Sequence, residues 1–162
     1  MALGPAIEYM SRLLLLTIFA VSSLSASAAD EKKSLKTFLT LCFKGYVSLL
    51  DKRAHTDRSK AAAVERSIEQ LKKRCLSEDF RKFWKQNESD SDPLLQAQDS
   101  CESWKSVARV ENLDIEKNSA RVILGKLSEE YCLSIDLKKV SSGYQIRSTS
   151  VCAATPLNCD KK

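Results

Sequence analysis

The six cysteines say most about the chemistry of this 162-residue chain. Their number is even, and no two of them form the Cys-x-x-Cys pair that is typical of redox-active thiols and of zinc ligands. The N-terminal segment described below has the features of an export signal, and an even set of cysteines in an exported chain is typical of disulfide bonds. We therefore expect disulfides, and no metal site, among Cys42, Cys75, Cys101, Cys132, Cys152 and Cys159.

The expected secondary structure ranks the possible disulfide pairings. Cys42 and Cys75 each fall on the apolar face of a predicted helix, so they can meet if those two helices pack together. Cys132 and Cys152 flank a predicted hairpin and are equally far from its turn, which places them opposite each other. The preferred arrangement therefore pairs Cys42 with Cys75 and Cys132 with Cys152.

The remaining two cysteines would then join a loop to the C-terminal tail, as Cys101 with Cys159. An alternative stays open, in which Cys101 pairs with Cys132 and Cys152 pairs with Cys159. The sequence alone does not choose between the two arrangements.

Neither the single histidine nor the carboxylates indicate a catalytic site. His55 lies in the polar segment 51–60, where no apolar flank would hold its imidazole against a serine or cysteine nucleophile. Nothing in the sequence marks a pair of carboxylates that would lie about 5–9 Å apart, as glycoside hydrolysis requires. We therefore predict that the protein is not an enzyme and needs no cofactor.

The charge of the chain excludes some classes of partner. With 26 Lys and Arg against 21 Asp and Glu, the net charge is +5. The basic residues form short groups at 72–74, 81–82 and 138–139 instead of a long tract, so we expect no nucleic-acid partner. The simplest interpretation is that these basic groups lie on solvent-exposed faces of helices and strands. The alternative is that they steer the protein electrostatically toward an acidic protein or an anionic envelope surface.

Residues 1–28 have the features of a cleaved export signal. Arg12 precedes the apolar run 13–21, and the small residues Ala26, Ser27 and Ala28 follow, as a signal peptidase requires. The run is too short to cross a hydrocarbon layer of about 30 Å. We expect a periplasmic protein with no stable membrane span after cleavage. An uncleaved N-terminal anchor helix is the alternative, and Met10 is a second possible start.

Apolar periodicity predicts three helices in the first half of the mature chain. Apolar residues repeat at helical spacing over Ser34–Leu50, with Ser34 as a possible N-cap, and again over 59–74. Ser77 is a suitable cap for a short helix over Glu78–Gln86. The buried side of this third helix is expected to consist of Phe80, Phe83 and Trp84.

The second half alternates with the period of strands. Four strands are expected over 107–115, 120–124, 131–137 and 144–152. Ser141, Ser142 and Gly143 suit the last turn, because glycine adopts positive φ without strain. Short connections imply an antiparallel meander covered by the helices, which is an α+β two-layer fold. We expect one domain over 29–152, followed by a tail, 153–162, that is held only if Cys159 is bonded.

The segment before the first strand carries a family resemblance. Residues Asp92–Asp99, followed by Trp104, resemble the Asp-Pro-Phe-Leu-x-Ala-Gln-Asp…Trp segment of a bacterial envelope family of unknown function. The stretches Phe43–Tyr46, Leu76–Phe80 and Gly143–Ile146 are also similar to that family. Two features depart from it, because Leu94 replaces the usual phenylalanine and six cysteines exceed the family's usual number.

The resemblance implies a nuclear-transport-factor-2-like (cystatin-like) cone, with two to three N-terminal helices on a curved four-stranded antiparallel sheet. Some relatives are envelope lipoproteins and others are periplasmic immunity proteins, and the family brings no catalytic residues. We therefore predict a non-catalytic exported binding protein, of the type that inhibits an antibacterial toxin. The alternative is a protein that binds a small ligand or an envelope component in the cone pocket.

Four residues of the connection between helices and sheet are candidates for binding. Gln96, Gln98, Asp99 and Trp104 concentrate polar and aromatic groups where a cone would open, which is a favourable place for a ligand. The alternative is that the polar side chains satisfy backbone groups of an irregular segment and that Trp104 belongs to the core.

Overall fold

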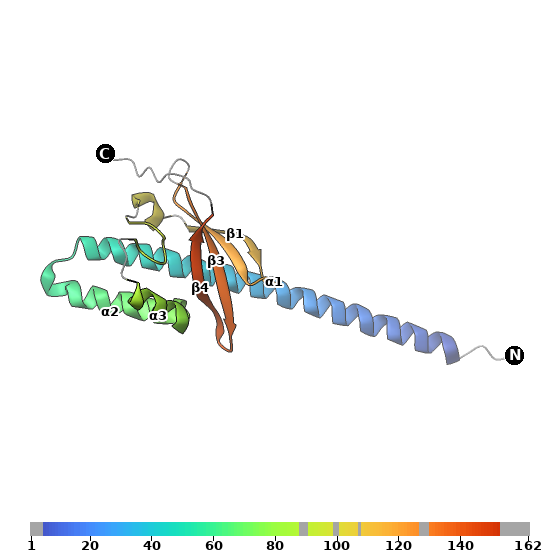
Figure 1. The fold of residues 1–162 in the computed structure, drawn as a ribbon. Helices are drawn as coiled ribbons and strands as arrows, with labels where there is room; N and C mark the ends of the chain where they lie inside the picture. The colour runs from blue at the N-terminus through green and yellow to red at the C-terminus, as the bar shows by residue number, and fades with distance from the viewer. Residues whose placement is uncertain (1–4, 88–90, 99–100, 107, 127–129, 153–162) are drawn as a thin grey trace. The chain divides into compact units, whose positions relative to one another are not determined.

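The computed structural model describes residues 5–87, 91–98, 101–106, 108–126 and 130–152, and the backbone alone for residues 5–26 and 102. By its internal contacts the chain divides into two units, Met1–Ser34 and Leu35–Lys162. The order of elements is helices first and strands last (Figure 1): α1 (Pro5–Ala54), α2 (Arg58–Cys75), α3 (Glu78–Gln86), the 3-10 helix η1 (Glu102–Lys105), β1 (Ala108–Asp114), β2 (Ser119–Leu124), β3 (Tyr131–Val140) and β4 (Gly143–Val151).

Helix α1 differs from its prediction at the N-terminal end. It begins at Pro5, so Ser34 lies inside the helix and is not its N-cap. Residues 28–33 contain alanine, glutamate and lysine, which favour helix, and no glycine or proline that would end it before Ser34. Among the described residues, no helix has both the length and the apolar character of a membrane span. The predicted signal and domain boundaries, 1–28 and 29–152, stay predictions.

The third helix follows its local signals closely. It occupies Glu78–Gln86 as predicted, and the Ser77 side chain accepts a hydrogen bond from the backbone N–H of Phe80 at 3.2 Å. The predicted buried side is correct for Phe80, whereas Trp84 is only partly buried and Phe83 is 51% exposed. The reason is that α3 packs against α2 and β4 along the side that carries Phe80, so Phe83 lies beyond the buried side.

Helices α1 and α2 pack closely around a glycine and a disulfide. A Cβ added at Gly45 would lie 2.9 Å from Cδ1 of Leu71, so the glycine permits the close approach of α2. One helical turn from Gly45, Cys42 is bonded to Cys75 with 6.0 Å between their Cα atoms. The predicted pairing of these two cysteines is therefore confirmed.

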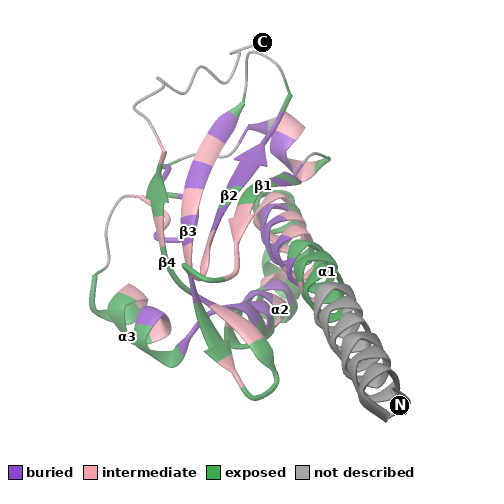
Figure 2. Ribbon diagram, turned by 90° about the vertical axis from the view of Figure 1, so that its right-hand side faces the viewer, coloured by how far each residue is buried: buried purple, intermediate pink, exposed green. Residues whose placement is uncertain are grey.

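The sheet is an open antiparallel meander in the order β1-β2-β3-β4. Burial alternates along β3 from Tyr131 to Leu137, so one face of the sheet is covered and the other is accessible (Figure 2). Gly143 opens β4 with φ +128°, in agreement with its predicted role in the turn. The Ser77 N–H donates to the Ile146 carbonyl at 2.8 Å, which attaches the start of α3 to β4. The predicted α+β fold is confirmed.

The other disulfide within the described residues joins the last two strands. Cys132 is bonded to Cys152 with 5.4 Å between Cα atoms, as the first ranking predicted. The alternative that paired Cys101 with Cys132 is therefore wrong, because a cysteine forms a single disulfide and Cys132 is bonded to Cys152. Cys101 is buried and disulfide-bonded, while its predicted partner Cys159 and the tail lie outside the described residues.

Candidate functional site

The structure gives the side chain of Gln96 a local structural role. Gln96 and Gln98 are exposed, and Gln96 adopts φ +55° in a tight turn. Its side-chain amide donates to the Pro93 carbonyl at 2.6 Å, and its own carbonyl accepts from the Tyr131 hydroxyl at 2.8 Å. Pro93 also accepts from the Thr149 hydroxyl at 2.9 Å, so the turn is fastened to β3 and β4.

Asp92 fastens the same turn to α1. Its Oδ1 accepts hydrogen bonds from the backbone N–H groups of Leu94 (2.9 Å) and Leu95 (3.0 Å), and its Oδ2 accepts from the Tyr46 hydroxyl at 2.5 Å. Burial raises the pKa of the Tyr46 phenol above its ordinary value, and the nearby negative charge of Asp92 raises it further. The carboxylate thus organises the turn, as side chains of irregular segments often do.

Trp104, a further candidate, lies in the core and does not line the pocket described below. Trp104 on η1 is 0% exposed and stacks on Tyr131 with ring centroids 4.9 Å apart. Tyr131 thereby connects Trp104 to the turn at Gln96. The structure thus brings these two predicted residues close together, with Trp104 buried in the core and Gln96 exposed at the surface. Asp99 lies outside the described residues.

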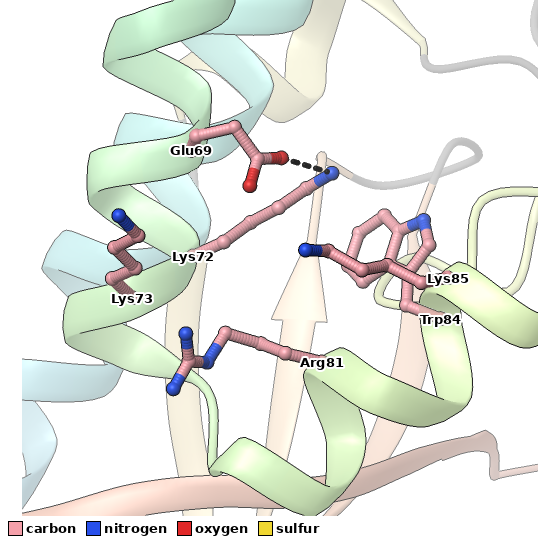
Figure 3. Close-up of a pocket in the computed structure, with 6 residues that line it drawn as sticks. All are labelled: Glu69, Lys72, Lys73, Arg81, Trp84 and Lys85. Carbon is pink, nitrogen blue, oxygen red and sulfur yellow. Dashed lines mark ion pairs between the residues drawn. The ribbon is translucent and has the colours of Figure 1, made fainter.

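A different site, which sequence reasoning missed, lies between α2 and α3. It is a hollow of about 60 Å³ whose lining is mostly cationic with one aromatic ring (Figure 3). Three lining residues come from α2 and three from α3: Glu69, Lys72, Lys73, Arg81, Trp84 and Lys85. We call this hollow the α2–α3 pocket.

Helical spacing explains why these side chains share a surface. On α2 the lining residues are i, i+3 and i+4 from Glu69, and on α3 they have the same spacing from Arg81. Residues at these spacings lie on one helix face. This repeated pattern was visible in the sequence, but nothing in the sequence indicated that the two faces meet.

One lysine of the α2–α3 pocket is held in place by two contacts. Lys72 Nζ lies 3.2 Å from Glu69 Oε1 and 4.0 Å from the centroid of the Trp84 ring. The two contacts fix the position of the amine, and the lysine side chain is only 18% exposed. Figure 3 shows Lys72 and Lys85 reaching from opposite helices toward the space beside Trp84.

The other three cations of the pocket lack counter-charges. Within the described part of the chain, Lys73, Arg81 and Lys85 form no ion pair. The Arg81 Nε is buried and has no hydrogen-bond partner there. By contrast, Lys82 on the outer side of α3 pairs with Glu78 at 2.9 Å, and this contact raises the pKa of Lys82. The pocket is therefore suited to an oxyanion, for which guanidinium and ammonium groups are the usual donors.

An exposed aromatic residue adjoins the α2–α3 pocket. Phe83 precedes Trp84 on α3 and stacks on Phe80 with ring centroids 6.4 Å apart, while half of its own surface faces solvent. Aromatic and cationic side chains close together on an exposed helix are typical of surfaces that bind proteins.

Comparisons with known proteins concern the fold. No family model and no curated protein matches the sequence, so the family resemblance stays a prediction. A crystal structure of a protein of unknown function from Bacteroides thetaiotaomicron is similar over 81% of this chain and 98% of its own, with 17% identity and a TM-score of 0.60. A chain of the type VI effector–immunity complex Tae3–Tai3 from Ralstonia pickettii covers 51% of this chain and 74% of its own, with 15% identity and a TM-score of 0.45. The chain thus shares its α+β fold with a structure of unknown function.

Proposed function

We propose that the protein is a non-catalytic, exported binding protein that inhibits another protein, as an immunity protein inhibits its toxin. The observation that carries the proposal is the exposed surface of α2 and α3, where Phe83 adjoins Trp84 and three cations that have no ion pair within the described residues. A protein partner that brings acidic and apolar groups would complement this surface.

The filled interior supports recognition at the outer surface. The core is occupied by fully buried side chains, of which Trp104, Tyr46 and Phe43 are the largest. The stack of Trp104 on Tyr131 lies where the sequence predicted the mouth of a cone pocket. A small ligand enclosed under the sheet would have to displace these rings, so this alternative gains no support.

The disulfides and the N-terminal segment support an oxidising location. Each of the two described disulfides would stabilise the fold by about 2–4 kcal/mol, but only where thiols remain oxidised. Together with the apolar segment at 13–21, this favours export to the periplasm. The resemblance of Asp92–Trp104 to a family that includes periplasmic immunity proteins supports the same location and role.

A pull-down with matched variants tests the proposed function. The tagged protein, purified from the periplasm of an expression host with its disulfides formed, is incubated with the product of the neighbouring gene and, separately, with periplasmic extract. We expect a stoichiometric complex that Phe83→Ala weakens by about tenfold or more, since exposed aromatic anchors commonly contribute more than 1 kcal/mol. Leu41→Ala is the matched control, because Leu41 is 59% exposed on α1.

Two results would overturn the proposal. One is the absence of a protein complex in both incubations together with a rise in melting temperature on addition of a small molecule, which would favour a ligand-binding protein. The other is a complex whose partner keeps its full toxic activity, because an inhibitor must abolish it.

A further inference from the structure

We infer that the α2–α3 pocket receives a carboxylate from an acidic segment of the protein partner. This inference rests on the proposed function for the nature of the partner, but its chemistry follows from the pocket alone. The occupant is a single Asp or Glu side chain presented by a larger molecule.

The charge of the lining favours an anion. The pocket combines four cations with one carboxylate, and that carboxylate already pairs with Lys72. Lys73, Arg81 and Lys85 have no opposite charge within the described residues, so their mutual repulsion is uncompensated. A bound negative group would remove this repulsion at a place where water is partly excluded.

Arg81 supplies the sharpest geometric argument. Its Nε is buried and unsatisfied among the described residues, although a guanidinium is well suited to donate two parallel hydrogen bonds to a carboxylate. A buried donor without an acceptor is unfavourable. A rotation of the Arg81 side chain toward an oxyanion in the pocket would give this N–H an acceptor.

The size of the α2–α3 pocket and the position of Glu69 favour some oxyanions over others. A hollow of about 60 Å³ is far smaller than the pockets of about 300–1,000 Å³ that enclose drug-sized ligands, so it admits one small group. Glu69 on one wall would repel a second negative charge, which favours a carboxylate over a doubly charged phosphate. The ring of Trp84 can cover the methylene groups of a glutamate side chain.

The exposure of Phe83 indicates that the anion belongs to a macromolecule. It is exposed on the same short helix and outside the pocket, so a free ion would leave its apolar surface in water. A partner with an acidic residue next to an apolar one would cover both features. Of the two kinds of anionic partner considered from the sequence, an acidic protein fits a concave site better than a flat envelope surface does.

Titrations followed by NMR test the inference. The isotope-labelled protein with intact disulfides is titrated with a capped oligoglutamate peptide, with the matching oligoglutamine peptide, with inorganic phosphate, and with phosphatidylglycerol vesicles. The signals observed are the Arg81 Nε–H and the Trp84 indole N–H. We expect saturable shifts of both signals with oligoglutamate, no shifts with oligoglutamine, and weaker binding of phosphate.

Three charge-neutralising variants separate the pocket from the general charge of the surface. Arg81→Gln and Lys85→Gln each remove one cation of the pocket, and Lys82→Gln removes one cation from the outer side of the same helix. We expect Arg81→Gln and Lys85→Gln to weaken oligoglutamate binding by about tenfold, the value of one charge-assisted hydrogen bond, and Lys82→Gln by about twofold at most. Lys85→Gln keeps the inference testable if Arg81→Gln lowers the melting temperature.

The outcomes distinguish this inference from the proposed function. Equal weakening by all three variants, or tighter binding of phosphate or vesicles than of oligoglutamate, would overturn the carboxylate site. If the protein complex of the pull-down forms and neither pocket variant weakens it, the inference fails while the inhibitor function stands. If oligoglutamate binds as expected, while no protein partner is captured and a small molecule raises the melting temperature, the carboxylate site stands and the inhibitor function fails.

Discussion

Removal of the Tyr46 hydroxyl gives a direct test of how the turn at Asp92 is held. Tyr46 is 2% exposed, and its hydroxyl donates to Oδ2 of Asp92 at 2.5 Å. Tyr46→Phe keeps the ring in the core and deletes only this donor. The hydrogen bond is made to a charged acceptor in a partly buried place, so its loss should lower the free energy of unfolding by about 1.5–3 kcal/mol.

Tyr131→Phe is a matched control, because it makes the same chemical change at a neutral acceptor. The Tyr131 hydroxyl donates to the Gln96 backbone carbonyl at 2.8 Å, in the same turn. Its loss should lower the free energy of unfolding by about 0.5–1.5 kcal/mol. Urea unfolding at pH 7 and 25 °C, followed by far-UV circular dichroism, measures both values.

The decisive result is which of the two substitutions lowers the free energy of unfolding more. If Tyr131→Phe is as destabilising as Tyr46→Phe, the charge of Asp92 adds nothing to the hydrogen bond, and the argument from charge is refuted. If Tyr46→Phe has no measurable effect, the turn is held without its bond to α1, by the two backbone hydrogen bonds to Oδ1 and by its contacts with β3 and β4. A double variant would then show whether the two hydroxyls act independently.

Three further predictions concern residues of α1 and the residues that they contact. Burial and then Asp92 raise the pKa of Tyr46 above its ordinary value of 10.0, so the unfolded chain loses this proton at lower pH than the folded chain does. The difference in the free energy of unfolding between the wild type and Tyr46→Phe should therefore shrink above about pH 10. Urea unfolding at several pH values measures this difference. Replacing Cys42 and Cys75 together by alanine should lower the free energy of unfolding by about 3–4 kcal/mol in urea, as expected for a bond between residues 33 positions apart. Gly45→Leu should cost about 1–3 kcal/mol, measured by thermal melting, because a side chain there must displace Leu71.

Local signals in the sequence were sufficient where the structure is determined locally. The ends of α3 were predicted because Ser77 caps the helix and acidic residues occupy its first turn. The strands were predicted because one face of the sheet is buried, which imposes alternation along β3. The two confirmed disulfides followed from the helical faces and the symmetric hairpin.

The remaining features depend on contacts between distant parts of the chain. The bond between Tyr46 and Asp92 spans 46 positions, and no pattern near either residue announces it. The α2–α3 pocket requires that two helix faces meet, so its cations were interpreted as ordinary solvated groups. Phe83 was expected in the core because aromatic residues usually are, but a nine-residue helix that packs along one stripe leaves it outside.

Tyr46 connects the two surfaces considered for binding. Its ring meets Trp84 of the α2–α3 pocket edge-on, with centroids 6.0 Å apart, and its hydroxyl holds the turn that carries Gln96. One residue of α1 therefore supports both places, through its ring on one side and its hydroxyl on the other. Tyr46→Phe should loosen the turn and leave oligoglutamate binding unchanged, because Trp84 keeps its neighbouring ring.

Tyr46→Ala removes both supports and should affect both places. We expect it to broaden the NMR signal of the Trp84 indole N–H and to weaken oligoglutamate binding, in addition to destabilising the fold by about 3–5 kcal/mol. Binding measured well below the melting temperature separates the two effects, since unfolding reduces the amount of competent protein but not its affinity. If folded Tyr46→Ala binds oligoglutamate as the wild type does, the position of Trp84 is set by Phe80 and Lys72 without help from α1.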